Sequence, residues 1–398
     1  MTGANRAERL RWLLLAVFVL SSAINYLDRQ ALATLAPLVR ADFHLSHAEY
    51  GWILGVFSIT YALSAPLAGM LIDRIGLNRA ASLAIGVWSC AGIATGFTSG
   101  LGSLIGCRAV LGAAEAGGIP AAGKAIHLYL RPPERALGNA INQAGVSLGA
   151  ILAPPLATWI ALRSGWRHAF IFTGILGLLW IPVWNWAARR MPAPATPSLA
   201  QTGAAGILRD RRLWAFVGAN ALSMVGYSLW TNWTTEYLVD AHSLTLQQAA
   251  WYAWIPPFVA MGGGFAGGWF SLRIMRGGTP AAAARFRVCF AAALLSLVTA
   301  AIPAAPTAAW AIAGISLSFF AVSAFSVNTY TLPLDTFGAA HAALAVSMLV
   351  ASYGAVQFLI SPVFGALIDR YGYTPVITFT ALTPLAACAV LRGMRAVE

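Results

Sequence analysis

Long apolar runs separated by short charged or Pro/Gly-rich breaks make up nearly the whole chain. Each run approaches or exceeds the roughly 20 apolar residues that a helix needs to cross a bilayer. The runs are too long and too apolar for the strands of a barrel, which leaves helices as the spanning elements. The pattern therefore predicts an all-α polytopic membrane protein with twelve transmembrane helices, at about residues 10–36, 49–70, 80–98, 101–123, 137–158, 166–187, 213–238, 248–271, 286–303, 307–330, 341–367 and 374–391.

The most polar connection follows the sixth run and is rich in Pro, Ala and Ser, a composition typical of linkers. It predicts an N-terminal six-helix bundle at 1–187, a cytoplasmic linker at 188–212 and a C-terminal six-helix bundle at 213–398. The fifth and eleventh runs each carry a proline in their middle or later part, and a Gly-aromatic pair opens the next run. Repeated halves of this kind are a recurring feature of secondary transporters.

Composition and charge agree with this interpretation. The chain has 398 residues, of which 59% are hydrophobic and only 10% charged, and its net charge is +12. Most of the 25 Lys and Arg residues fall in connections that share one side of the membrane if the N-terminus is cytoplasmic. This distribution places both termini in the cytoplasm and explains the net charge without a nucleic-acid partner. The four cysteines lie in apolar runs without paired spacing, so we expect no disulfide framework and no metal site.

Four charged residues fall inside apolar runs. Asp28 and Arg29 are adjacent in the first run, and Arg108 and Glu115 lie seven residues apart on one face of the fourth. A charge inside a membrane span costs roughly 2.5–3.5 kcal/mol on insertion scales, so such charges pair with one another or face a water-filled cavity. The group is either a static ion-pair cluster that fixes helix packing or a proton site beside an anion site. Neighbouring helix positions point about 100° apart, which lets Asp28 face the fourth span while Arg29 faces the cavity.

The end of the second run, GMLIDRIGLNR at 69–79, resembles the loop signature of the major facilitator superfamily. Its residues Asp73, Arg74, Gly76 and Arg79 stand at matching places, and Gly69 is expected to permit close helix approach. We expect these residues, together with Asp335 at the inner end of the tenth run, to act in conformational gating.

Five stretches resemble the anion:cation symporter branch of that superfamily, most of all its hexuronate and sugar-acid transporters: NYLDRQ, the loop signature, RAVLGAAEAGGIP, NQAGVSLGAILAPPL and NTYTLPLD. The resemblance implies the major facilitator fold. It also implies that Arg29 grips a substrate carboxylate, that Asp28 and Glu115 carry protons, and that Arg108 tunes them. Polar contacts in the cavity are then expected from Tyr26, Tyr61, Asn142 and Gln143.

The second half has no ionisable residue in the middle of a run; Glu236 and Asp240 fall near the outer end of the seventh. We therefore expect this half to supply shape and neutral hydrogen bonds to the substrate. The candidates are Tyr227, Trp230, Asn328, Ser352 and Gln357. Packing and interfacial roles are the alternatives for the aromatic residues, and helix–helix hydrogen bonding is the alternative for Ser352.

The sequence thus predicts a proton-coupled symporter in the bacterial inner membrane that imports a small organic anion, a hexuronate or related sugar acid, by alternating access. Its partners are the anion, protons and the lipid bilayer, it acts as a monomer, and no cofactor is expected. The alternative is an exporter of amphiphilic drugs or aromatic acids by proton antiport, which the aromatic seventh run suggests; a drug cation, however, needs neither Arg29 nor Arg108. Sodium remains open as the coupling ion. The six histidines form no H-x-x-H pattern, and we expect no enzymatic activity.

Overall fold

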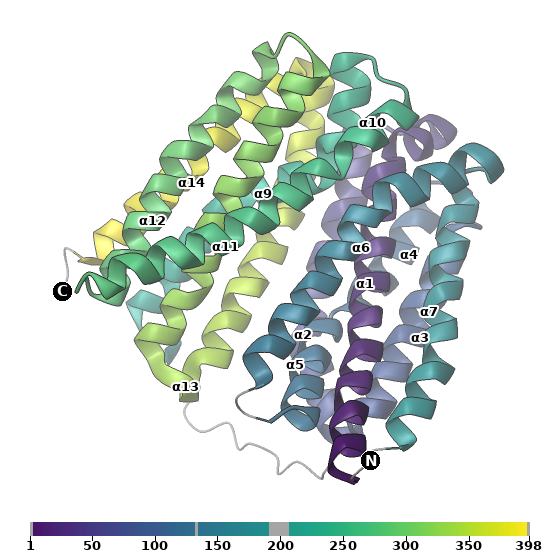
Figure 1. The fold of residues 1–398 in the computed structure, drawn as a ribbon. Helices are drawn as coiled ribbons and strands as arrows, with labels where there is room; N and C mark the ends of the chain where they lie inside the picture. The colour runs from purple at the N-terminus through teal and green to yellow at the C-terminus, as the bar shows by residue number, and fades with distance from the viewer. Residues whose placement is uncertain (1–2, 132–133, 191–206, 396–398) are drawn as a thin grey trace. The chain divides into compact units, whose positions relative to one another are not determined.

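The computed structural model describes residues 3–131, 134–190 and 207–395, and these residues form helices and short connections without a strand (Figure 1). Residues 191–206, which make up most of the predicted linker, lie outside this description. The helices are α1 (Gly3–Phe43), α2 (His47–Ile75), α3 (Leu77–Thr95), α4 (Leu101–Glu115), α5 (Gly118–Tyr129), α6 (Arg135–Ser164), α7 (Trp166–Arg189), α9 (Arg211–His242), α10 (Leu246–Ala253), α11 (Ile255–Arg276), α12 (Ala281–Leu295), the 3₁₀ helix η2 (Ser296–Ala304), α13 (Ala308–Tyr371) and α14 (Tyr373–Arg395).

All twelve predicted runs fall on helical elements, although five of them do not correspond to one separate helix. The fourth run is divided into α4 and α5, and the eighth into α10 and α11. The ninth run is divided into α12 and the 3₁₀ helix η2. The tenth and eleventh runs belong to one continuous helical element, α13. Eight helical segments in the described part of the chain are long and apolar enough to cross a membrane. The prediction of an all-α polytopic membrane protein is confirmed.

Side-chain caps begin several of these helices where the chain is polar. Asp210 accepts a hydrogen bond from the backbone N–H of Arg212 at the start of α9, at 2.8 Å. The side chain of Arg212 also donates to this carboxylate, which lowers the pKa of Asp210. Thr245 and Gln248 form a reciprocal capping box at the start of α10. Polar breaks between the apolar runs thus act as helix starts.

The chain divides into two compact units, one of residues 1–43 and 56–199 and the other of residues 44–55 and 200–398. Helix α2 therefore begins in the second unit and continues in the first. The core of the first unit contains the stacked rings of Trp180 and Trp184, whose centroids lie 5.3 Å apart. The core of the second unit is built around buried residues that include Phe216 and Phe325.

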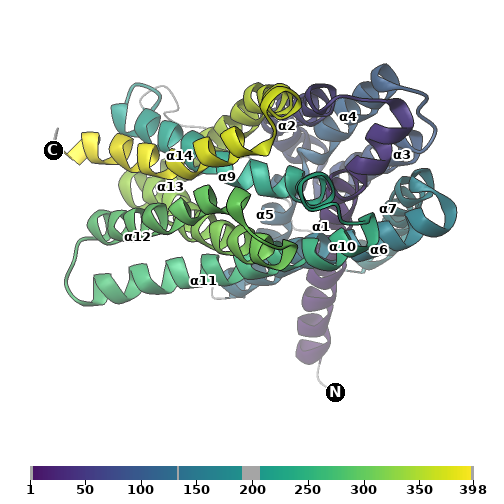
Figure 2. The same ribbon diagram turned by 90° about the horizontal axis from the view of Figure 1, so that it is seen from above.

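Helices α1 and α6 pack closely in the first unit, and both views show them side by side (Figures 1 and 2). A Cβ at Gly149 of α6 would lie 2.2 Å from the carbonyl oxygen of Ala23 on α1, and one at Gly145 would lie 2.5 Å from Val19. Only glycine fits so close to a neighbouring backbone, and small residues are the usual means of helix packing in membranes. This contact places the polar residues of α1 and α6 on one shared wall.

Replacing Gly149 by alanine is expected to destabilise the first unit. The added methyl group must push α6 away from α1, and overpacking of this kind costs about 1–3 kcal/mol. Thermal melting of the purified protein in detergent measures the effect. Gly106→Ala on α4 is the matched control, because a Cβ there meets no atom within 4 Å. Equal melting temperatures for the two variants would contradict the close contact.

Candidate functional site

A cavity of about 850 Å³ lies in the first unit. Its apolar lining comes mainly from α2, α3, α4 and α5, and polar side chains enter it chiefly from α1 and α6. The polar residues that line it are Ser21, Ser22, Asn25, Tyr26, Arg29, Tyr61, Ser64, Glu115, Asn139, Asn142 and Gln143. A largely apolar cavity with a few polar groups at one place is the usual form of a small-molecule site.

Arg29 and Glu115 form an ion pair in this cavity. The Nε and one terminal nitrogen of Arg29 donate to Oε2 of Glu115, at 3.0 and 2.7 Å. The side chain of Glu115 is fully buried, and that of Arg29 is 22% exposed. Glu115 is the last residue of α4, directly before the break that separates α4 from α5. Removing one partner of such a buried pair typically costs 3–5 kcal/mol, because the other charge is left without compensation.

Three aromatic rings surround the guanidinium of Arg29. Its central carbon lies 4.8 Å from the ring centre of Tyr26, 5.1 Å from that of Phe57 and 5.0 Å from that of Tyr61. Cation–π contacts of this kind are strongest where water is excluded. The three rings, from α1 and α2, hold the guanidinium in place.

Asp28 lies outside the set of residues that line this cavity and is 2% exposed. Its Oδ1 accepts a hydrogen bond of 2.5 Å from the hydroxyl of Thr173 on α7. A Cβ at Gly92 on α3 would come within 3.3 Å of the same oxygen, so a glycine leaves room for the carboxyl group. The adjacent residues Asp28 and Arg29 therefore occupy separate sites, one between helices and one in the cavity.

Arg108 is 2% exposed, and its guanidinium lies 5.3 Å from the ring centre of Phe170. It attracts the charge of Asp28 more strongly than Arg29 does. Asp28 in turn repels the charge of Glu115. Arg29 and Glu115 thus form an ion pair, and the charges of Arg108 and Asp28 act on this pair through space. A change in the charge of either carboxylate alters the energy of the other, which is the property that a coupled proton and anion site needs.

The predicted polar contacts of the first half reach the same cavity. Tyr26, Tyr61, Asn142 and Gln143 all line it. Asn142 accepts a hydrogen bond of 2.8 Å from Ser22, which ties α6 to α1. The four residues surround the cavity from three helices, α1, α2 and α6.

The predicted contacts of the second half lie in the second unit, and several take part in its packing. Trp230 is buried and donates to the hydroxyl of Ser318 at 2.8 Å. Asn328 donates to the carbonyl oxygens of Gly267 and Ala324. These bonds give both residues a structural role within the unit.

The other three candidates also lie in the second unit. Tyr227 contacts the rings of Phe319 and Tyr353, at 5.1 and 5.9 Å. Ser352 accepts a hydrogen bond from Asn220. Gln357 is 6% exposed. Their role in substrate contact stays a prediction.

Among the predicted gating residues, Gly76 has a clear structural reason. Its φ of +84° makes the turn between α2 and α3, a conformation that glycine adopts without strain. The close approach expected at Gly69 is not seen in the described residues, since a Cβ there would meet no atom within 4 Å. Arg74 and Arg79 are exposed, and the side chain of Asp73 lies outside the description.

Asp335 forms an ion pair with Arg285 of α12 at 2.5 Å. The pair joins α12 to α13 within the second unit. A gating role for Asp335 stays a prediction, and the structure identifies Arg285 as its basic partner.

The sequence analysis missed Phe57 and Thr173. Phe57 stands four residues before Tyr61 and therefore shares its helix face, which is a signal that the spacing contained. Thr173 is 145 residues from Asp28, and nothing local connects the two. Only the packing of α7 against α1 reveals this contact.

A family model described as the Major Facilitator Superfamily matches residues 18–349. The chain belongs to the Major Facilitator Superfamily. Two solved structures of a bacterial homolog to the human lysosomal transporter Spinster share this fold. One has a TM-score of 0.80 and 20% identity over 96% of both chains, and the other has a TM-score of 0.82 and 20% identity. The predicted major facilitator fold is confirmed.

Curated relatives match between two thirds and nearly all of the length of this major facilitator. It is 27% identical to the hexuronate transporter of Escherichia coli K12, over 99% of this chain and 96% of that protein. It is 28% identical to the galacturonate transporter of Dickeya chrysanthemi, over 67% and 83%. It is 29% identical to a probable sulfoacetate transporter of Cupriavidus necator, over 91% and 88%. The predicted resemblance is confirmed, and the protein is a multi-pass membrane transporter and not an enzyme.

The bond between Thr173 and Asp28 is expected to stabilise the first unit. Thr173→Val keeps the shape of the side chain and removes the hydroxyl donor, which should cost about 1.5–3 kcal/mol for a hydrogen bond to a charged group. Thr158→Val on α6 is the control, since its buried hydroxyl makes no hydrogen bond to a described residue. Thermal melting in detergent should show a loss for the first variant and little change for the second. Equal losses would contradict the bond.

Proposed function

We propose that this protein is a proton-coupled symporter that imports a hexuronate or a related sugar acid. It would work in the bacterial inner membrane as a monomer with both termini in the cytoplasm, and two six-helix bundles would expose the site to each side in turn. The observation that carries the proposal is the guanidinium of Arg29, which is bonded to Glu115 inside a cavity lined by polar side chains.

The first step is a competition for Arg29. A planar guanidinium binds one carboxylate in a bidentate manner, and Glu115 occupies two of its donors. A substrate carboxylate that enters the cavity can take the same donors and displace Glu115. The buried carboxylate of Glu115 then loses its strongest compensation, and protonation removes the cost of an uncompensated charge. Binding of the anion therefore favours binding of a proton.

The second carboxylate, Asp28, extends this coupling. Arg108 and the hydroxyl of Thr173 act on the carboxylate of Asp28, and Asp28 acts on Glu115, so a change of charge at one acid affects the other. External protons would load the two acids, and their release to the cytoplasm would restore the ion pair of Arg29 with Glu115. Each transport cycle would thus move protons together with the substrate anion.

The polar wall of the cavity favours a sugar acid over a plain carboxylate. Asn25, Asn139, Asn142 and Gln143 offer amide donors and acceptors, and Ser21, Ser22 and Ser64 offer hydroxyl groups. Such groups can pair with the several hydroxyls of a uronate, and a site built from them disfavours ligands that leave them unpaired. The names of the relatives, which include hexuronate and galacturonate transporters, support the same substrate class.

The rival proposal, an exporter of amphiphilic drugs, is less consistent with the site. A cationic drug gains nothing from a guanidinium at the polar wall. An aromatic acid keeps the carboxylate but not the hydroxyls, so it leaves the amides of α1 and α6 unmatched. The sugar acid is the ligand that uses both features.

Arg29→Lys is expected to weaken binding of galacturonate by about 10- to 100-fold. Lysine keeps the charge but lacks the planar fork, and the lost hydrogen bond to a charged group is worth about 1.5–3 kcal/mol. A thermal-shift titration of the purified protein measures the affinity, with sulfoacetate and an aromatic acid as comparison ligands. Arg163→Lys is the control, because Arg163 is exposed and lies over Trp159. Unchanged affinity in Arg29→Lys would overturn the gripping role.

Glu115→Gln is expected to keep the exchange of substrate across the membrane and to lose its proton-driven accumulation. Glutamine keeps the shape and hydrogen bonds to Arg29 but carries no proton, so a pH gradient should no longer drive uptake into proteoliposomes, whereas exchange of labelled for unlabelled galacturonate should continue. Glu8→Gln, at an exposed position of α1, should leave both activities unchanged. Loss of both activities in Glu115→Gln would point to a structural ion pair and argue against proton coupling.

A further inference from the structure

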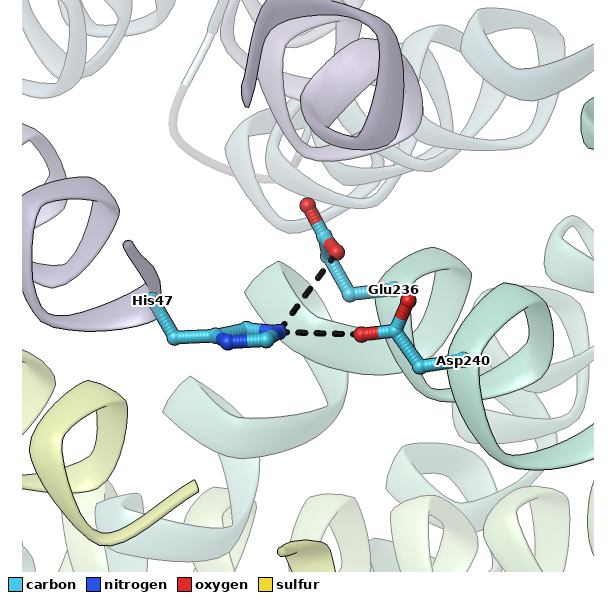
Figure 3. A group of neighbouring side chains, drawn as sticks. All are labelled: His47, Glu236 and Asp240. Atoms are coloured by element: carbon cyan, nitrogen blue, oxygen red, sulfur yellow. Dashed lines mark hydrogen bonds and ion pairs between the residues drawn. The ribbon is translucent and has the colours of Figure 1, made fainter. Parts of the chain in front are cut away.

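A histidine and two carboxylates meet at one end of the second unit (Figure 3). His47 is the first residue of α2, and Glu236 and Asp240 lie one turn apart on the last part of α9. The three ligand atoms lie within 4.8 Å of one another. Neither the cavity of the first unit nor the proposed transport mechanism uses these residues.

The imidazole ring of His47 is oriented toward the two acids. Its Nε2 lies 2.9 Å from Oδ2 of Asp240 and 3.9 Å from Oε2 of Glu236. Both side chains point to this nitrogen from the same helix (Figure 3). The side chain of Glu236 is fully buried, that of His47 is 14% exposed and that of Asp240 is 34% exposed. The site therefore has a closed inner side and an open side at Asp240.

A third carboxylate, that of Asp369, helps to orient the ring of His47 toward Glu236 and Asp240. Oδ1 of Asp369, near the end of α13, lies 2.7 Å from Nδ1 of His47. The same carboxylate accepts from the backbone N–H groups of His47 and Ala48 and so caps the start of α2. Nδ1 thus faces Asp369, and Nε2 faces Glu236 and Asp240. Metal-binding histidines almost always place their second nitrogen against a carboxylate, a backbone carbonyl or water.

Two further groups complete the surroundings of His47. The hydroxyl of Tyr373 on α14 donates to Oδ2 of Asp240 at 2.8 Å. The ring of Trp233 stacks on the imidazole, with centroids 6.1 Å apart. The groups that face His47 from the helices packed against it are thus Glu236 and Asp240 from α9, Asp369 from α13 and Tyr373 from α14. Three helices hold the ring in one orientation.

We propose that Nε2 of His47 and the carboxylates of Glu236 and Asp240 bind a divalent transition metal ion of the zinc class. The sequence analysis expected no metal site in this protein. In a tetrahedral zinc site with bonds of about 2.0–2.2 Å, neighbouring ligand atoms lie roughly 3.3 Å apart. The distances of 2.9 and 3.9 Å lie on either side of that value, so small side-chain shifts would bring the atoms to it.

The donor set selects among metal ions. One imidazole nitrogen with two carboxylate oxygens suits Zn²⁺, whereas Mg²⁺ and Ca²⁺ prefer oxygen ligands alone. Zinc would replace the proton that Nε2 shares with Asp240 in the metal-free protein. Three protein ligands leave a fourth position for water on the open side of the site.

A bound ion would join the start of α2 to α9. His47 belongs to the short part of α2 that lies in the second unit, and α2 continues from there into the first unit. Two glycines already bring this part of α2 close to α13: a Cβ at Gly51 would lie 2.2 Å from the oxygen of Ser361, and one at Gly365 would lie 2.1 Å from the oxygen of His47. Because α2 continues into the first unit, zinc would restrain the start of this helix and slow the transport that the proposed function describes.

Direct titration of the full-length protein with zinc tests the site. The protein is purified in detergent without a histidine tag and titrated with Zn²⁺ against a chromophoric chelator. One ion per chain is expected. His47→Asn and Glu236→Gln should each weaken binding at least about tenfold, and Mg²⁺ should not compete. His44→Asn is the matched control, since His44 is an exposed histidine three residues away and its φ of +53° is one that asparagine accepts.

The outcomes are distinct. Zinc bound equally by the wild type, His47→Asn and Glu236→Gln would be surface binding and would overturn the proposal, as would no binding to the wild type. If His47→Asn does not fold, Glu236→Gln and Asp240→Asn decide the same question. Inhibition of galacturonate exchange by zinc, present in His44→Asn and absent in His47→Asn, tests the effect on transport. If the protein binds zinc but transports no sugar acid, the metal site is supported and only the proposed substrate is wrong.

Discussion

The cost of a charge away from water is the constraint on which the rest of this structure depends. Arg29 and Glu115 meet it by forming a short ion pair in the cavity of the first unit. The pair needs α1, which carries Arg29, and the end of α4, which carries Glu115, at a fixed separation. It also needs the aromatic residues of α1 and α2 around the guanidinium. The helices of the first unit are thus arranged around two side chains that could not be buried alone.

The same constraint explains why the site can respond to a ligand. A buried pair is a poor source of stability compared with apolar packing, but it is sensitive to any third charge that enters. The charges of Asp28 and Arg108 act on this pair through space. The rigid parts of the unit, such as the contact of Gly149 with Ala23, keep these distances while the charges change. Helix packing fixes the distances between the charges, and in the proposed mechanism the electrostatic interactions change when a ligand or proton binds.

His47 lies in a different arrangement of charged groups. Its ring lies among three carboxylates from two helices, and a backbone cap and a stacked tryptophan hold its orientation. The Arg29–Glu115 pair and the group around His47 suit ligands of opposite charge. Arg29 presents a guanidinium to the cavity, as the proposed anion site requires, whereas His47 presents Nε2 beside two acids, as the proposed cation site requires. The two proposed sites lie in separate units.

The sequence alone determined the class of this protein, because its apolar runs are long enough to span a bilayer as helices. The same runs are too long and too apolar for the strands of a barrel, the other structure that satisfies its backbone hydrogen bonds in lipid. It also indicated that Asp28 and Arg29 point apart, since the helical repeat requires this of neighbours. What it left open was the choice of partners. Arg29 pairs with Glu115 across 86 residues, Asp28 accepts from Thr173 across 145, and His47 reaches Asp369 across 322. The continuous helix through α13 and the structural bonds of Trp230 and Asn328 were equally unpredicted. Periodicity is a local property of the chain, whereas pairing depends on which helices pack together, and only the tertiary structure decides that.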